Sequence, residues 1–348
     1  MAVQCMEKTL LVTLDFPPLT GGVANYYLNR VKKMPSDKVA VLMNGLEIRN
    51  QKLEIRDFKI YYKFFFTKLI WPHWLPLIWQ VYKIAKKENA KILWAGQILP
   101  VGTAVYVVSK LLRLPYCISC HGNDLLRAKQ HLRKYKLARK ILQKAEYVEA
   151  NTQFTKNILI KDFGINGDKV KIVYPECDLS KKMVDKNKVQ ALQKKYNLDG
   201  KKVLLTVARL VKSKGISQVL TALEQVWQIV PDLHYLIIGD GPDKNRLIQI
   251  VGRLPRAHRS KIIFVGAVPH TELPNYYGLA DIFILTPRKI GIDTESFGIV
   301  YLEALEFNLP VIAGNVGGVK EIKHNKIILV DSENVGEIAR EIKSQLLK

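Results

Sequence analysis

Residues 202–239, KVLLTVARLVKSKGISQVLTALEQVWQIVPDLHYLIIG, contain the pattern that decides the fold. An apolar run at 202–208 is followed by an amphipathic stretch at 216–230 and a second apolar run at 233–239. Apolar runs of this length predict buried strands, and the longer stretch with a 3.6-residue period predicts a helix. Strand, helix and strand in this order predict two parallel strands with the helix packed on one face of their sheet.

The same alternation extends in both directions along the chain. It predicts parallel sheets covered by helices on both faces. The predicted strands are 9–14, 38–43, 58–66, 91–95, 115–120, 147–150, 170–174, 202–208, 233–239, 261–265, 282–286, 310–313 and 327–330. The predicted helices are 23–33, 75–88, 102–112, 154–161, 216–230, 276–279, 298–307 and 335–347, with a lysine-rich helix before residue 200.

A chain of 348 residues is long enough for two hydrophobic cores. The segment Tyr174-Pro175-Glu176-Cys177-Asp178 lies near the middle, and we expect the domain boundary there. The fold class is therefore α/β, with Rossmann-like, doubly wound domains at 1–174 and 175–348 facing each other across a cleft. Ligands of such folds bind outside the carboxyl ends of the strands.

The positive charge is large and uneven. The formal net charge is +23, and residues 1–174 hold 29 Lys and Arg against 12 Asp and Glu, whereas the remainder holds 25 against 19. This balance predicts an anionic partner: nucleic acid, an acidic membrane surface or a phosphorylated substrate. A solvated basic surface is the alternative, but it does not explain the difference between the halves.

Cysteine usage and hydropathy predict a reduced, cytoplasmic protein. The pair Cys117 and Cys120 has the spacing of a redox or zinc half-motif, but no second pair completes a four-ligand site. The pair lies in a predicted buried strand, where we expect both to act as small apolar residues. No secretory signal and no apolar run of eighteen residues is present. The other two cysteines are Cys5 and Cys177.

The segment from Glu295 to Glu303, ESFGIVYLE, carries the most chemical information. Two carboxylates bracket Ser296, a candidate helix cap, and the start of an apolar helix near Gly298. The free amides at such a helix start attract an anion. A nucleotide sugar fits the spacing, with its pyrophosphate at the helix start and each carboxylate accepting hydrogen bonds from vicinal hydroxyls. An acidic helix start with an ordinary glutamate inside the helix is the alternative.

Other polar residues follow predicted strands of the second half. Arg209 and Lys214 come after the strand at 202–208, where a guanidinium and an ammonium could neutralise a departing diphosphate. Gly239 and Gly241 follow the strand at 233–239. They permit close approach of a ligand to the backbone, with a simple turn as the alternative.

Two strand ends of the first half carry a similar signal. Gly21 and Gly22 precede a helix and could form a phosphate cradle, although the lysine and hydroxyl of a P-loop are absent. His121 and Asp124 follow the strand at 115–120 and predict substrate contacts, with a polar turn as the alternative.

Taken together, these motifs resemble the retaining glycosyltransferases of family 4, which have the GT-B fold. The resemblance covers almost the whole chain and is specific in the order and spacing of its motifs. It rests on Pro17-Pro18-x-x-Gly21-Gly22, His121-Gly-x-Asp124, Arg209 with Lys214-Gly215, Gly239-x-Gly241, Glu295-x7-Glu303 and Gly317-Gly318-x-x-Glu321.

The resemblance implies a role for each site residue. Gly22 would contact the donor phosphate and His121 the transferred sugar, while Arg209 and Lys214 would stabilise the leaving diphosphate. Glu295 would orient the sugar hydroxyls and Glu303 would bind the ribose. The backbone near Val268 would contact the base, and the amides of Phe297, Gly298 and Ile299 would hold sugar and phosphate.

The resemblance also implies the chemistry. In the family the leaving phosphate is thought to deprotonate the acceptor on the same face, with no established covalent nucleophile. The metal-binding Asp-x-Asp motif of other transferases is absent from the sequence, so we expect no metal and no cofactor besides the nucleotide-sugar substrate. Residues 281–313 look most like bacterial mannosyltransferases acting on phosphatidylinositol lipids, which favours GDP-mannose over a UDP-sugar. The chain stops at Lys348, before the crossing helix usual in related enzymes, which suggests a truncated or shortened form.

Residues 59–87 combine aromatic rings with lysines, a composition suited to lipid headgroups. We predict that the first domain docks peripherally on an anionic membrane, such as the inner face of the plasma membrane, and takes a lipid-linked acceptor from it. The alternative is a buried strand at 58–66 under an amphipathic helix at 75–87, which leaves only 67–74 exposed. The residues concerned are Tyr61, Tyr62, Phe64, Phe65, Phe66, Trp71, Trp74, Trp79, Lys63, Lys68, Lys83, Lys86 and Lys87.

Two other functions compete with glycosyl transfer. The first is a basic protein that binds nucleic acid or membrane without turnover, but the basic stretches lack any nucleic-acid-reading signature. We therefore expect no nucleic-acid partner. The second is a GT-B nucleotide-sugar epimerase, which would release an isomerised donor.

Overall fold

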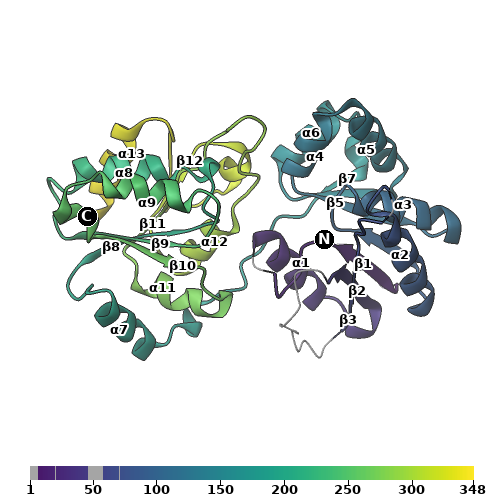
Figure 1. The fold of residues 1–348 in the computed structure, drawn as a ribbon, viewed down its shortest axis with the longest axis horizontal. Coiled ribbons are helices and arrows are strands. Elements are labelled where there is room, and N and C mark those ends of the chain that lie inside the picture. Colours follow the sequence, from purple (N-terminus) through teal and green to yellow (C-terminus); the bar gives the residue numbers. More distant parts are fainter. Residues whose placement is uncertain (1–6, 20, 46–57, 70) are drawn as a thin grey trace. The chain divides into compact units, whose positions relative to one another are not determined.

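The computed structural model describes residues 7–19, 21–45, 58–69 and 71–348. The chain divides into two compact units, Met1–Glu176 (unit 1) and Cys177–Lys348 (unit 2). The division falls two residues after the boundary expected from the sequence. Each unit contains a parallel sheet with helices on both faces, drawn in Figure 1.

The described part of unit 1 forms a seven-stranded parallel sheet in the order β3-β2-β1-β4-β5-β6-β7. Its strands are β1 (Thr9–Thr13), β2 (Val39–Asn44), β3 (Lys59–Lys63), β4 (Ile92–Ala95), β5 (Tyr116–Cys120), β6 (Tyr147–Ala150) and β7 (Val170–Ile172). Its α-helices are α1 (Gly22–Lys32), α2 (Leu75–Lys87), α3 (Val101–Leu112), α4 (Asn123–Lys129), α5 (Leu132–Lys144) and α6 (Gln153–Lys161).

Unit 2 forms a six-stranded parallel sheet in the order β10-β9-β8-β11-β12-β13. Its strands are β8 (Lys202–Val207), β9 (Leu233–Ile238), β10 (Ile262–Gly266), β11 (Ile282–Leu285), β12 (Val311–Gly314) and β13 (Ile327–Val330). Its α-helices are α7 (Lys186–Lys195), α8 (Ile216–Val226), α9 (Lys244–Gly252), α10 (Arg256–Arg259), α11 (Leu273–Leu279), α12 (Ile299–Glu306) and α13 (Val335–Leu346).

Alternating strand residues build a core on each face of each sheet. In β1, Leu10 and Val12 join the cluster formed with α2, α3 and α5, whereas Leu11 joins the cluster under α1. In β8, Leu204 packs with α8 and α13, and Leu205 packs with α11 and α12. Successive side chains of a strand point to opposite faces, so strands buried on both faces are mostly apolar, as the sequence predicts.

The structure differs from the predictions at one strand and at four helices. The strand expected at 58–66 is limited to β3, an edge strand whose residues are half-buried or exposed. Helices α4, α5, α9 and α10 were not predicted. Helix α5, the longest of them, carries six Lys and Arg among thirteen residues and buries only Ala138, Ile141 and Leu142. A single narrow apolar stripe in a basic segment gives a weak periodic signal.

Cys117 and Cys120 are buried, as predicted. Both lie in β5 with free thiols, and burial raises the pKa of Cys120 well above its ordinary value. Among the described residues no three His, Cys, Asp or Glu side chains form a group that could hold a metal ion. Cys5 lies outside the described residues. No helix in the described ranges combines the length and the apolar character needed to cross a bilayer.

Candidate functional site

The carboxyl edge of the unit 2 sheet brings separate sequence motifs together. Strand β8 lies between β9 and β11, so the direction of winding reverses between β8 and β11, where ligands of open parallel sheets bind. Lys214 ends the short turn Lys212–Lys214 that follows β8. Glu295 lies in the loop after β11, and its carboxylate accepts a hydrogen bond from the Lys214 ammonium. The two residues, 81 positions apart, form an ion pair at this edge.

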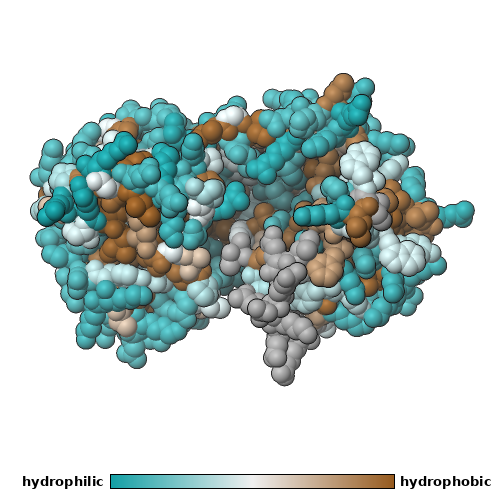
Figure 2. All heavy atoms as spheres, in the orientation of Figure 1, coloured by the Kyte–Doolittle hydropathy of each residue, from teal (hydrophilic) through white to brown (hydrophobic). Residues whose placement is uncertain are grey.

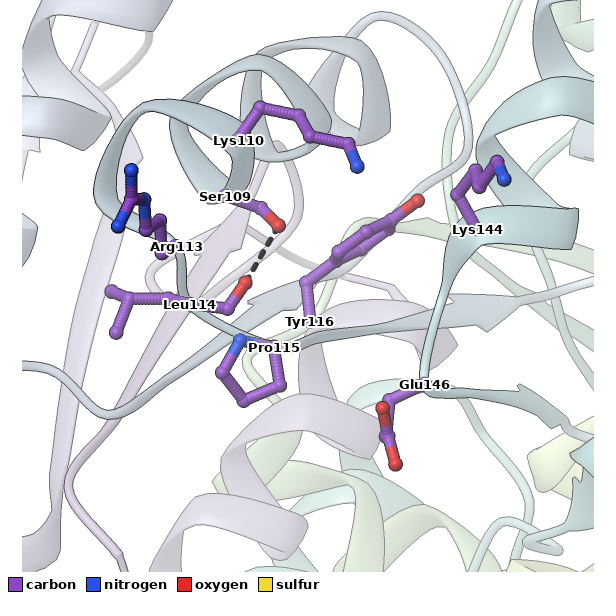
Figure 3. A pocket seen from close by; sticks show the side chains of 8 residues that line it. All are labelled: Ser109, Lys110, Arg113, Leu114, Pro115, Tyr116, Lys144 and Glu146. Carbon is purple, nitrogen blue, oxygen red and sulfur yellow. Dashed lines mark hydrogen bonds between the residues drawn. The ribbon is translucent and has the colours of Figure 1, made fainter.

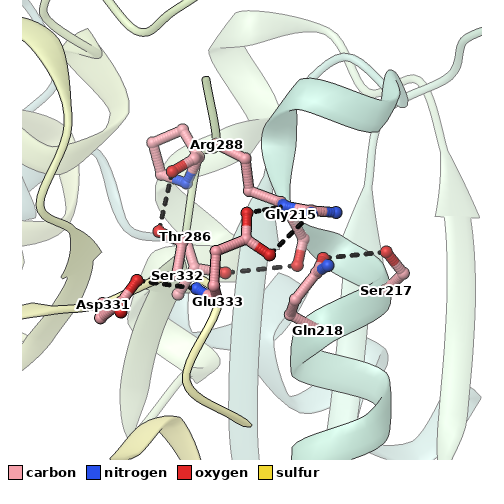
Figure 4. Close-up of polar contacts among 9 residues, drawn as sticks. Gly215, Ser217, Gln218, Thr286, Arg288, Asp331, Ser332 and Glu333 are labelled. Atoms are coloured by element: carbon pink, nitrogen blue, oxygen red, sulfur yellow. Dashed lines mark hydrogen bonds and ion pairs between the residues drawn. The ribbon is translucent and has the colours of Figure 1, made fainter. Parts of the chain in front are cut away.

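Polar contacts hold the turn that carries Lys214. A Cβ added to Gly215 would lie 1.8 Å from the carbonyl oxygen of Thr286, so only glycine allows this approach. The Thr286 hydroxyl donates to the Gly215 carbonyl at 3.2 Å. The Arg288 guanidinium donates to both carboxylate oxygens of Glu333, at 2.5 and 2.7 Å (Figure 4). The Arg288 amide also donates to the Ser213 carbonyl at 2.8 Å, so the loop after β11 fixes the position of the turn, and Glu333 after β13 holds Arg288.

The apolar helix α12 begins one residue after Gly298, close to the predicted position. Gly298 precedes it with a left-handed backbone (φ 84°), and no side chain caps the helix. The prediction that Ser296 caps this helix is therefore wrong, because the left-handed Gly298 separates the serine from the first turn. The uncapped amides at this end leave a partial positive charge free for an anion.

A glycine pair from another motif supports the loop of Glu295. The Gly318 amide donates to the Glu295 carbonyl at 3.1 Å. A Cβ on Gly317, whose φ is +55°, would lie 1.9 Å from the same carbonyl oxygen. The motif that begins at Gly317 thus supports the loop that carries Glu295, a role that its sequence does not indicate.

Glu303 lies in the second turn of α12 and is almost completely buried, with 1% of its surface exposed. The Tyr277 hydroxyl donates to its Oε2 at 2.7 Å. The Nε2 of His270 lies 3.3 Å from its Oε1. Burial, with the neighbouring Glu303 carboxylate as a second cause, raises the pKa of Tyr277 well above its ordinary value, so Tyr277 remains a donor.

Arg209 and the glycines after β9 lie at the same edge. Arg209 is exposed, and no ion pair of its side chain occurs within the described ranges. Cβ atoms on Gly239 and Gly241 would meet the carbonyl oxygens of Ala208 and Leu210 at 1.9 and 2.4 Å. These glycines therefore serve first to bring two backbone segments together around Arg209. Val268, predicted to lie near the base, is half-buried after β10.

In unit 1, His121 follows β5 and contacts α1. Its Nε2 lies 2.7 Å from the Tyr27 hydroxyl, and its ring packs edge-on against the ring of Tyr27. Burial lowers the pKa of His121 to about 4, so the ring is neutral at pH 7. Asp124 accepts hydrogen bonds from the amides of His121 and Leu125, both at 3.0 Å, and burial raises its pKa to about 6. The contacts of Asp124 thus shape the turn that presents His121.

Gly21 and Gly22 mark the start of α1, as predicted, and both are exposed. Thr20, within the same motif, lies outside the described residues. Gln97, after β4, donates to Asp15 at 2.8 Å and accepts from the Leu14 amide at 3.1 Å. These contacts lie where the strand order of unit 1 reverses, between β1 and β4.

Several of these contact residues were not singled out from the sequence. Asp15 directly follows a predicted strand and Gln97 lies two residues after another, which is the one signal that could have found them. Tyr27, His270 and Tyr277 carry no such signal, because each is an ordinary residue whose contact depends on tertiary packing.

A cavity of about 360 Å³ lies elsewhere in unit 1, where β5 begins (Figure 3). Its hydroxyl groups are already satisfied: Ser109 donates to the Leu114 carbonyl and Tyr116 to the Ile141 carbonyl, both at 2.6 Å. None of the predicted site residues lines it.

Two family models match the chain and together cover most of it. Residues 20–181 match the model described as Glycosyltransferase Family 4. Residues 188–348 match the model described as Glycosyl transferases group 1.

Curated relatives with similar sequences include transferases that act on a lipid. The GDP-mannose-dependent alpha-(1-6)-phosphatidylinositol monomannoside mannosyltransferase of Mycobacterium tuberculosis is 25% identical over 98% of this chain and 90% of its own length. The enzyme of the same name from Mycolicibacterium smegmatis is 26% identical over 90% of this chain and 81% of its own length.

A solved structure, HepE of Anabaena in complex with UDP and glucose, superposes with a TM-score of 0.79 at 19% identity, covering 98% of this chain and 90% of that one. A glycosyltransferase from Rickettsia africae superposes with a TM-score of 0.76 at 19% identity, covering 98% and 89%. Both likenesses concern the fold. With the two family matches and the motifs at the sheet edges, they lead to one conclusion: the chain belongs to the family 4 glycosyltransferases and has their GT-B fold.

Proposed function

We propose that this glycosyltransferase moves mannose from GDP-mannose to a membrane-associated or glycan acceptor, with retention of the anomeric configuration and without a metal ion. The observation that carries the proposal is the set at the unit 2 sheet edge: the Lys214–Glu295 pair, the uncapped start of α12 and the buried Glu303. A cation, the amides of a helix start and two carboxylates are the groups that a diphosphate joining two sugars needs.

Each group has a task in the proposed reaction. The amides at Phe297, Gly298 and Ile299 bind the pyrophosphate, and Arg209 and Lys214 neutralise it. Glu295 accepts from the sugar hydroxyls and Glu303 from the ribose diol. Because Lys214 and Glu295 are paired in the structure, donor binding exchanges their mutual contact for contacts with the phosphate and the sugar.

The proposed transfer needs no protein nucleophile. The bond from the sugar C1 to the phosphate oxygen breaks while the acceptor oxygen bonds to C1 on the same face. The acceptor proton passes to the leaving phosphate oxygen, and the charge that develops there is stabilised by preorganised donors. His121, neutral at pH 7, contributes a hydrogen bond to the transferred sugar rather than a charge.

The names of the relatives support GDP-mannose as donor, since those similar along nearly the whole chain are GDP-mannose-dependent. A UDP-sugar is the second candidate, because HepE was solved with UDP and glucose. Thermal unfolding with GDP-, UDP- and ADP-sugars tests the donor: a ligand at one hundred times its dissociation constant stabilises the protein by about 2.7 kcal/mol. Stabilisation by none of the three would contradict the proposed site, and stabilisation by UDP-glucose alone would correct the donor.

We also propose that unit 1 docks on an anionic membrane. Phe64 and Trp79 are more than half exposed, and 93% of Leu69 and 84% of Trp71 are exposed. Lys63, Lys68 and Lys83 lie beside them in sequence and are exposed too. The exposed set extends beyond 67–74 on both sides, which favours docking over the buried alternative, although Phe65 is fully buried. Figure 2 shows exposed hydrophobic residues among hydrophilic ones where unit 1 carries α2 and α3.

A further inference from the structure

The carboxylate of Glu303 is held at both of its oxygens. It lies inside unit 2, where an ionised group is costly unless hydrogen bonds replace its water. Tyr277 donates to Oε2 at 2.7 Å, and the Nε2 of His270 lies 3.3 Å from Oε1. An ionised carboxylate has about four acceptor positions, so these two contacts leave positions open for two further donors. A vicinal diol supplies two such donors.

The two contacts differ in rigidity. Tyr277 is fully buried in α11, and its ring stacks on that of Phe307 at 5.2 Å. His270 belongs to the short turn His270–Glu272 after β10, and its side chain is 26% exposed. Its Nε2 also lies 3.7 Å from Oδ1 of Asp178, so the ring nitrogen faces two carboxylates. Both carboxylates favour an N–H at Nε2 directed toward them.

A single hydrogen bond does not fix the plane of a glutamate carboxylate, because its terminal torsion has a broad, shallow preference. With Tyr277 alone, the Oε1 side could rotate away from a bound ligand. The contact of His270 with Oε1 is the second contact that fixes the plane of the carboxylate. We propose that His270 is a positioning residue that fixes the plane of Glu303 for the ribose diol and thereby sets the preference of the donor site for ribonucleotides over deoxyribonucleotides.

This inference rests on the proposed function and adds a residue that the family motifs do not include. It makes a separable prediction, because His270 acts on the ribose through Glu303 and not on the phosphates. His270→Ala should weaken GDP binding about tenfold, the scale of one hydrogen bond to a charged group. Binding of 2′-deoxy-GDP should change little, and kcat at saturating donor should stay within about twofold.

The experiment is calorimetric titration of the full chain with GDP, 2′-deoxy-GDP and UDP. The variants are His270→Ala, His270→Gln and Tyr277→Phe. His234→Ala is the matched control, because His234 is a histidine of the same unit whose ring contacts the Asp232 carbonyl in an exposed position. The glutamine amide can donate at a similar reach and should restore most of the preference for GDP. Tyr277→Phe should reduce the preference as His270→Ala does, and His234→Ala should match wild type.

The outcomes separate the two claims. If wild type binds neither GDP nor UDP, the proposed function fails. If wild type prefers GDP to its deoxy form and His270→Ala keeps that preference, or loses affinity for both ligands equally with a lower melting temperature, the role of His270 is overturned and the proposed function stands. If wild type binds both forms equally, the ribose contact of Glu303 is overturned and with it the role of His270.

Discussion

At the scale of single residues, three of the charged groups proposed for the site have partners within unit 2. Lys214 pairs with Glu295, and Glu303 is held by Tyr277 and His270. These contacts hold the side chains of the proposed site in position, which is the condition for electrostatic stabilisation of a transition state. The cost is that Lys214 and Glu295 must separate when phosphate and sugar arrive.

Removing Lys214 should therefore slow transfer more than it harms folding. We expect Lys214→Ala and Arg209→Ala each to cost about 2.7–4 kcal/mol of transition-state stabilisation, the scale for one preorganised donor. Steady-state kinetics give this value from kcat/KM. Lys212→Ala is the matched control, because Lys212 is an exposed lysine of the same turn. Near-normal activity of Lys214→Ala would mean that the phosphates bind elsewhere.

His121 and Asp124 should oppose each other in the pH dependence of stability. The pKa of His121 falls from 6.5 to about 4 on folding. Between these pH values the unfolded chain binds a proton that the folded chain does not, so the free energy of unfolding decreases as the pH falls. The pKa of Asp124 rises from 3.8 to about 6 on folding. Between these pH values the folded chain binds a proton that the unfolded chain does not, so the free energy of unfolding increases as the pH falls. In wild type the two effects largely cancel.

Single substitutions should uncover each effect. Between pH 7 and 4.5, Asp124→Asn should lose about 2 kcal/mol more stability than wild type, and His121→Gln should lose about 2 kcal/mol less. Urea denaturation at both pH values measures the difference. Parallel pH profiles for the two variants would show that neither group titrates as its burial implies.

At the scale of elements, glycines decide which loops can meet. Gly317 and Gly291 both have left-handed backbones, with φ of +55° and +59°. A Cβ on Gly317 would lie 1.9 Å from the Glu295 carbonyl oxygen, whereas a Cβ on Gly291 would meet nothing within 4 Å. Comparing alanine at the two positions separates backbone strain from steric displacement of the Glu295 loop.

We expect Gly291→Ala to lower the free energy of unfolding by about 1–3 kcal/mol, the cost of the left-handed conformation alone. Gly317→Ala should cost about 2 kcal/mol more through overpacking and should also reduce turnover. Urea denaturation and kinetics of both variants measure the two effects. Equal losses would show that Gly317 does not support the site.

The sequence predicted strands well where both faces of the strand are buried, and it predicted less well the elements that are largely exposed. Most residues of β8 and β9 are apolar and buried, and the prediction was correct for both strands. Helix α5 buries only a narrow face and was missed, and the edge strand β3, which has no fully buried residue, is shorter than predicted. At the site, Lys214 and Glu295 were predicted because their motifs are local in sequence. His270 and Tyr277 were not, because their contacts with Glu303 cross 33 and 26 residues and appear only after folding.

At the scale of the whole molecule, the positive charge of unit 1 supports the proposed membrane docking. The net charge of +23 is concentrated in the first half of the chain. A lysine near an anionic bilayer contributes about 1 kcal/mol, so a few lysines beside exposed rings are enough for reversible docking. A soluble glycan acceptor would leave both the charge and the exposed rings without a role.

Co-sedimentation with liposomes tests this docking. Binding should require anionic lipid, fall as salt is raised, and weaken when Trp71 and Leu69 are replaced by alanine, because both expose most of their surface. Ile229→Ala, which removes an exposed apolar side chain of unit 2, should bind like wild type. Equal recovery in the supernatant with neutral and anionic vesicles at low salt would point to a soluble acceptor.

The central claim is sugar transfer at the unit 2 sheet edge, and product analysis after incubation with GDP-mannose tests it most directly. The reaction contains anionic vesicles with phosphatidylinositol and its monomannoside, and excess EDTA. The account predicts release of GDP in equal amount to a mannosylated lipid whose new linkage keeps the α configuration of the donor, and loss of both products in Lys214→Ala. A linkage of inverted configuration, a requirement for added metal, or an isomerised donor without transfer would contradict it.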